Sequence, residues 1–319
     1  MEERKLIRLG NSSFAISLPK EWIDKSNLKK GDKVFLVPNS NGEIIVSPEF
    51  KKPGQDKRIT INLDGKDETK IKREFTSAYI NGNSIFEFIG NTNKEKSRQI
   101  KKIVREYISC EVTEESENSI IAKDFFNFEE MNMNNFIRRM DNNLKEMFEI
   151  IIKGLEKKEI TASEVNEMDS IDLDINKFYF LNSRIMIMGL NNQTLINKLK
   201  IEPTDLFNNW WLAFHLEHTG DNLKAIAKKI KSEDINQETK KLLLTILSLI
   251  KEKYEDSLET FYSGDKELAY KIMEKSKKNW ELCENLTKSK NAFLSLVGEK
   301  LKNIENASYQ IVKMISHLK

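Results

Sequence analysis

The segment RLGNSSFAISLPKEW, residues 8–22, decides the fold of the N-terminal part of this chain. Apolar and polar residues alternate over residues 4–9 and again over FAISL, residues 14–18. This alternation predicts two short strands joined by the polar loop GNSS. Pro19 fixes a helical φ angle at a helix start and keeps the residue before it extended. The segment therefore predicts a strand, a loop, a second strand and a short helix.

The residues that follow predict two more strands. Gly31, in LKKGD, supplies the positive φ angle of a turn, and KVFLV, residues 33–37, has the composition of a strand. Asn41 and Gly42 form a two-residue hairpin signal before EIIVS, residues 43–47. The whole unit, residues 1–48, has too few apolar residues for a core of its own but enough for half of one. We therefore expect this unit to need a partner.

Three stretches of this unit, RKLIRLGNSSFAISLPKEW, LKKGDKVFLV and NGEIIVSP, resemble the AbrB/SpoVT (MazE-like) family of swapped-hairpin β-barrels. The matching positions are Arg8, Gly10, Asn11, Ser12, the Leu18-Pro19-Lys20 helix start and the Lys30-Gly31-Asp32 turn. The family builds one barrel from two chains. The resemblance therefore implies a homodimer, formed through the N-terminal barrel, that binds double-stranded DNA.

Basic and polar side chains near the N-terminus are the candidates for DNA contact. They are Arg4, Lys5, Arg8, Asn11, Ser12 and Lys20. The four basic residues exceed the two acidic ones, Glu2 and Glu3, by 4 − 2 = +2. Arg4 and Arg8 would share one face of a strand, from which they could reach base edges or phosphates. Two alternatives remain: the charges only solvate a dimerisation module, or the unit acts as an antitoxin-like partner.

The composition of the whole chain limits its function. The 319 residues carry a formal net charge of only +2, so any contact with nucleic acid must be local. Cys110 and Cys283 match no metal or redox spacing, and we interpret both as buried thiols of a reducing compartment. The sequence shows no signal core and no apolar run that could span a bilayer. We expect a cytoplasmic protein that is not embedded in a membrane.

A small α+β module is predicted for residues 58–126. Strands are predicted at 59–63 and at SIFEFIG, helices at 67–82 and 94–108, and a final hairpin at CEVTEES and NSIIAKDF. The linker before it, SPEFKKPGQDKR, is rich in proline and basic residues. The stretch FTSAYINGNSI, with Tyr79 and Gly82, resembles the middle module of archaeal chains that join an AbrB-type barrel to a PhoU-type bundle.

Apolar residues recur at three- and four-residue spacing from residue 131 onward, which predicts an all-α unit of about six helices over 131–319. Breaks are expected near Glu159, 191–203, 231–236, 264–265 and 288–290. Segments 215–230 and 300–315 align with each other, which suggests two three-helix repeats, at about 131–232 and 236–318. The predicted fold class is multidomain and mainly α: a dimeric N-terminal barrel, an α+β module and a helical bundle.

The helical half resembles PhoU, whose repeats end in a segment similar to LEHTGD, residues 216–221. That family implies a role in phosphate uptake and acidic pairs that can hold metal clusters. Glu217 and Asp221 lie four residues apart and share a helix face, while Asp172 has Asn176 at the second position of its motif. A divalent or iron ion at Glu217, Asp221 and Asp172 is therefore a hypothesis, although no cofactor is required. The alternative is that these carboxylates bind neighbouring helices or water.

The sequence thus predicts a homodimeric DNA-binding transcriptional regulator of phosphate uptake or metabolism, in which the bundle senses a signal. The alternative function is an adaptor whose bundle binds a phosphate transporter or a sensor kinase, with the barrel serving only to dimerise it. No catalytic triad, cofactor loop or partnered catalytic carboxylate pair is recognisable, so we do not expect an enzyme.

Overall fold

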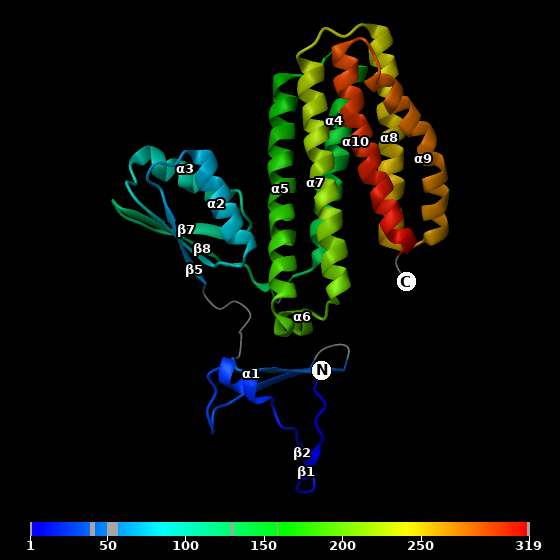
Figure 1. Cartoon of the computed structure of the whole chain (residues 1–319). Helices are drawn as coiled ribbons and strands as arrows, with labels where there is room; N and C mark the ends of the chain where they lie inside the picture. The colour runs from blue at the N-terminus through cyan, green and yellow to red at the C-terminus, as the bar shows by residue number, and fades with distance from the viewer. Residues whose placement is uncertain (1, 39–41, 50–56, 129–130, 158, 318–319) are drawn as a thin grey trace.

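A computed structural model describes residues 2–38, 42–49, 57–128, 131–157 and 159–317 of the chain. The chain forms an N-terminal pair of hairpins, an α+β module and a long helical bundle (Figure 1). The Asn41 hairpin signal and most of the predicted linker lie outside the described residues. Within the described part of the chain, none of the helices combines the length and hydropathy of a membrane span.

The N-terminal unit consists of two separate antiparallel hairpins with one short helix between them. Strands β1 (Ile7–Leu9) and β2 (Ser13–Ala15) pair with each other, and so do β3 (Phe35–Pro38) and β4 (Ile44–Ser47). Helix α1 spans Lys20–Lys25 after Pro19. The element order was predicted correctly, but the strands are shorter than expected. The described residues of one chain close no barrel, because the two hairpins form separate sheets.

The middle module is a four-stranded sheet covered on one face by two helices (Figure 1). Its strands, in spatial order, are β5 (Arg58–Asn62), β6 (Ile85–Ile89), β8 (Ser119–Asp124) and β7 (Cys110–Glu115). Strands β5 and β6 are parallel, and the other two pairs are antiparallel. The helices are α2 (Glu68–Ile80) and α3 (Lys94–Arg105), each capped by a side chain, Asp67 or Asn93. The predicted strands and helices of this module are confirmed.

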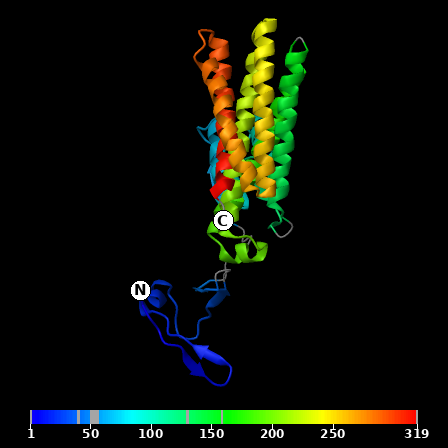
Figure 2. The same cartoon turned by 90° about the vertical axis from the view of Figure 1, so that its right-hand side faces the viewer.

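The C-terminal half consists of long helices that lie side by side (Figure 2). One group contains α4 (Met133–Glu156), α5 (Ala162–Leu190) and α7 (Pro203–Lys231); the other contains α8 (Gln237–Ser263), α9 (Lys266–Thr287) and α10 (Ala292–His317). The two groups pack together through α7 with α10 and α4 with α8. All five predicted breaks are confirmed. The break at 191–203 also holds a short helix, α6 (Gln193–Leu199), which the sequence prediction missed.

The middle module docks onto α5 through one buried arginine. The Arg184 guanidinium donates to Asp124 Oδ2 at 2.7 Å, to the Asn83 carbonyl at 2.8 Å and to the Tyr79 carbonyl. Arg184 is only 1% exposed, and its guanidinium carbon lies 4.7 Å from the centre of the Tyr79 ring. Nη1 and Nη2 carry these bonds, while Nε is buried without a partner among the described residues. Because removing one partner of a buried ion pair is costly, the pair fixes α2 and β8 against α5.

Gly82 allows the middle module to approach α5 closely at the same junction. Its φ angle is +82°, and an added Cβ would lie 2.9 Å from the Met188 side chain in α5. Tyr79 and Gly82, the positions that carried the sequence resemblance of this module, therefore both lie at its junction with the bundle.

Candidate nucleic-acid interface and acidic cluster

The first hairpin presents one of the predicted DNA contacts. Arg8 in β1 lies directly opposite Phe14 in β2, so both side chains project from the same face of the hairpin. Gly10 begins the turn with a φ angle of +69°, a region that favours glycine. Arg8 Nε donates to the Gly10 carbonyl at 3.2 Å, which holds the guanidinium beside the turn. Asn11 and Ser12 occupy this turn and are exposed.

The other predicted contacts are exposed but more dispersed. Lys20 is the first residue of α1, the helix that follows β2 along the chain. Arg4 and Lys5 precede β1 and have no regular structure, and Arg4 pairs with Glu2 at 2.5 Å. The predicted shared strand face of Arg4 and Arg8 was wrong, because β1 begins only at Ile7. The structure therefore groups Arg8, Asn11 and Ser12 around one turn.

Large apolar side chains of the N-terminal unit are exposed to an unusual degree. Leu6, Phe14, Leu36 and Ile44 are each more than 60% exposed, and Ile7, Leu9 and Ile16 more than half. None of the residues in α1 is buried. A concentration of large exposed apolar side chains in one small unit points to an interaction site. The unit thus has enough apolar residues for half a core, and in a single chain these residues are exposed to solvent.

The acidic residues predicted in the bundle do meet, but around a lysine. Lys224 Nζ in α7 lies 2.5 Å from Asp172 Oδ2 in α5 and 2.9 Å from Asp221 Oδ1. Asn176 Nδ2 also donates to Asp172, at 3.3 Å. Burial alone would lower the pKa of Lys224, but its hydrogen bonds with the two aspartates raise it, so the ammonium remains charged. This ion pair joins α5 to α7.

Glu217 lies beside this cluster without an ion pair among the described residues. Its partial burial, together with the negative charges of Asp221 and Asp172, raises its pKa to about 7. The Lys224 charge opposes this shift but does not cancel it. Glu217 is thus a carboxyl that can take up a proton near neutral pH.

A metal ion fits this arrangement poorly. In the part of the chain that the structure describes, no three His, Cys, Asp or Glu side chains converge as a metal site requires. The Lys224 ammonium already lies where a cation would bridge Asp172 and Asp221. His215 is buried against Trp211, with ring centroids 4.1 Å apart, and burial lowers its pKa to about 4. The metal assignment for Glu217, Asp221 and Asp172 stays a prediction.

Lys224 is the residue of this site that sequence reasoning missed. It follows Asp221 by three residues on the same helix, and i, i+3 spacing of opposite charges would have indicated a pair. Its second partner, Asp172, is remote in sequence, and no local pattern indicates that contact. In the aligned segment of the second half, Lys302 stands at the position of Glu217, and its Nζ lies 4.5 Å from the Trp280 ring centroid.

Comparison with known proteins identifies only the N-terminal unit. Residues 7–56 match the family model described as "Antidote-toxin recognition MazE, bacterial antitoxin". No curated protein and no solved structure matches the chain significantly. The match covers the two hairpins and α1, and domains of this type are compatible with a dimeric DNA-binding regulator. The phosphate connection and the PhoU resemblance of the bundle have no support from these comparisons.

Proposed function

We propose that this chain is a homodimeric DNA-binding regulator, in which the N-terminal units of two copies join into one barrel that contacts double-stranded DNA. The observation that carries the proposal is the row of exposed apolar side chains on both hairpins, within the segment that matches the MazE family. Burial of apolar surface contributes about 25 cal/mol per Å², which favours covering these side chains with a second copy.

The DNA contact in this proposal is made by the turn between β1 and β2. Arg8 supplies a guanidinium, which can bind phosphate or guanine in a bidentate manner, and Asn11 and Ser12 supply hydrogen-bonding groups beside it. A dimer presents two such turns, related by its two-fold axis, and therefore suits a palindromic operator. Lys20, Lys5 and Arg4 add positive charge around them.

The bundle receives the signal in this proposal. Its resemblance to PhoU suggests that the signal reports phosphate status, either directly or through a transporter or sensor-kinase component. The protein acts by binding and is not an enzyme. Glu217 and the Lys224 cluster, at the α5–α7 junction, are the titratable groups that a signal could influence.

The test is fluorescence anisotropy of the full-length protein with labelled duplexes from its own upstream region and with a scrambled duplex, at several salt concentrations. Loss of sequence preference in Arg8→Ala indicates a base contact. Each phosphate contact contributes about −0.9 to the slope of log K against log salt, so a slope smaller by about 1.8 indicates that the two Arg8 side chains bind phosphate as well. Lys271→Ala is the matched control, because Lys271 is an exposed basic residue of α9.

Preference for the upstream duplex by about tenfold, lost in Arg8→Ala and kept in Lys271→Ala, is the expected outcome. Equal binding of both duplexes, or no binding, would exclude sequence recognition by this hairpin. The barrel would then serve only dimerisation, and the adaptor function would replace the regulator. Pull-down of the cytoplasmic parts of the phosphate transporter and of a sensor kinase by the full-length protein would then test the adaptor.

A further inference from the structure

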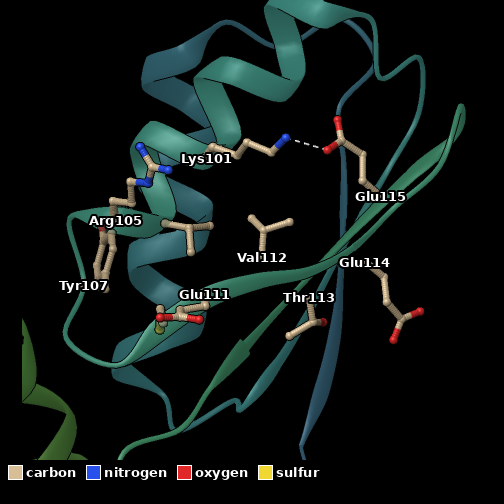
Figure 3. Close-up of a pocket in the computed structure, with 10 residues that line it drawn as sticks. Lys101, Arg105, Tyr107, Glu111, Val112, Thr113, Glu114 and Glu115 are labelled. Atoms are coloured by element: carbon tan, nitrogen blue, oxygen red, sulfur yellow. Dashed lines mark hydrogen bonds and ion pairs between the residues drawn. The ribbon is translucent and has the colours of Figure 1, made fainter.

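The middle module has a groove between helix α3 and strand β7 (Figure 3). This edge groove has a volume of about 590 Å³, and Lys101, Val104 and Arg105 of α3 line one wall. The opposite wall is β7, from Cys110 to Glu115. Strand β7 is the outermost strand of the sheet, and its only neighbour among the described strands is β8. One edge of β7 therefore faces the groove without a partner strand.

The backbone of β7 has free hydrogen-bonding groups on that edge. Two hydrogen bonds of 2.8 Å mark the ends of the β7–β8 hairpin: Ser116 N–H to the Ser119 carbonyl, and Phe125 N–H to the Ser109 carbonyl. Because hydrogen-bonded and non-hydrogen-bonded pairs alternate along antiparallel strands, Val112 and Glu115 direct their N–H and C=O groups away from β8.

A β-bulge keeps these two residues on the same side of the sheet. The register shifts between Val112 and Glu114, so Thr113 is the extra residue. As a result, Val112 and Glu115 both face α3, and Glu115 pairs with Lys101 at 2.5 Å (Figure 3). The two walls of the groove are apolar at Val104 and Val112, and the Lys101–Glu115 ion pair bounds one end of it.

The charges on the two sides of β7 differ in sign. On the helix side, Arg105 is exposed and has no ion pair among the described residues. On the opposite side of the sheet, Glu111 is exposed, and Glu114 has only a 3.9 Å contact with Lys123. An added strand would point alternate side chains to these two sides. An acidic or apolar residue suits the helix side, and a basic residue suits the other.

We propose that the edge groove binds an extended peptide segment of a partner protein, which adds a strand beside β7. The segment alternates acidic or apolar residues, facing Arg105 and Val112, with basic residues, facing Glu111 and Glu114. Main-chain hydrogen bonds to Val112 and Glu115 supply affinity, and the alternating side chains supply specificity. The strand β7 of a second copy suits this edge poorly, because three of its six residues are glutamates and pairing two such strands would bring like charges together.

The test selects peptides on the immobilised full-length protein from a synthetic library of acetylated, amidated heptapeptides with randomised central positions. The retained sequences should alternate acidic or apolar residues with basic ones. Arg105→Glu should reverse the preference, so that lysine replaces the acidic residue at the same position. Arg98→Glu is the matched control, because Arg98 is an exposed arginine of α3 that does not line the groove.

Val112→Pro tests the backbone contact separately. It removes the outward N–H of Val112 and leaves the bonds to β8, so the β7–β8 pairing should remain and peptide affinity should fall about tenfold. Val112→Ala keeps the N–H and controls for the lost valine side chain, so it should lose less affinity than the proline variant. Absence of any enriched pattern, or enrichment that Arg105→Glu and Arg98→Glu alter equally, would overturn the proposal. Unchanged affinity in folded Val112→Pro would overturn the strand-addition mode.

Discussion

Replacing Glu217 by glutamine should change how the free energy of unfolding depends on pH. In the folded chain, burial and the charges of Asp221 and Asp172 raise the pKa of Glu217 to about 7, against an ordinary value of 4.5. The folded state therefore binds this proton more tightly than the unfolded state does. The ionised form weakens folding, so stability is lost as the pH rises from about 4.5 to about 7.

The size of the effect follows from the pKa difference. A shift from 4.5 to about 7 corresponds to at most about 3.4 kcal/mol at high pH, using about 1.36 kcal/mol per pKa unit. Water screens a partly exposed carboxyl, which reduces the expected effect to about 1–2 kcal/mol. Glutamine cannot ionise and escapes this penalty. The stability of the variant relative to the wild type should therefore increase by about 1–2 kcal/mol as the pH rises from 4.5 to 8.

Urea unfolding at a series of pH values measures this difference directly. Glu167→Gln, an exposed residue of α5, controls for the general exchange of an acid for an amide. A stability difference between Glu217→Gln and wild type that is the same at every pH would refute the reasoning. It would mean that Glu217 ionises as freely in the folded protein as in the unfolded chain.

Three further outcomes are expected. Arg184→Met should cost about 3–5 kcal/mol in urea unfolding, because it leaves Asp124 buried without its partner; a loss below about 1 kcal/mol would contradict this. Gly298→Ala should cost about 1–3 kcal/mol, because the new Cβ would lie 2.8 Å from the Thr287 backbone nitrogen; an unchanged unfolding midpoint would contradict it. Lys224→Ala should cost about 1–3 kcal/mol in urea unfolding, because it leaves the buried Asp172 beside Asp221 without a cation; an unchanged unfolding midpoint would refute the role of the lysine.

The local elements could be predicted from the sequence because their signals are local. Alternation and Pro19 indicated the N-terminal strands and α1, and three- and four-residue spacing indicated the six long helices. Helix α6 was missed because it is a single short segment inside an expected break. The first strand was predicted to begin at residue 4, but it begins at Ile7. Residues 4–6 continue the sequence pattern of the strand, but they have no pairing partner in one chain.

Contacts between distant segments could not be predicted in the same way. Arg184 and Asp124 are sixty residues apart, and neither has a neighbouring residue that indicates a buried pair. The Lys224 contact with Asp172 likewise depends on how α5 packs against α7. The edge groove depends on the strand order β5-β6-β8-β7, which places β7 outermost, and on the bulge at Thr113. Local sequence patterns do not determine that strand order.

The central claim is that two chains complete one N-terminal unit, and sedimentation equilibrium of the full-length protein tests it most directly when wild type is compared with Leu36→Asp. Leu36 is 63% exposed in the single chain, so the aspartate should not destabilise that chain on its own. The wild type should have a mass near 2 × 37.2 = 74.4 kDa, and the variant should have a mass near 37.2 kDa. A monomeric wild type, or a dimer that persists in Leu36→Asp, would contradict it.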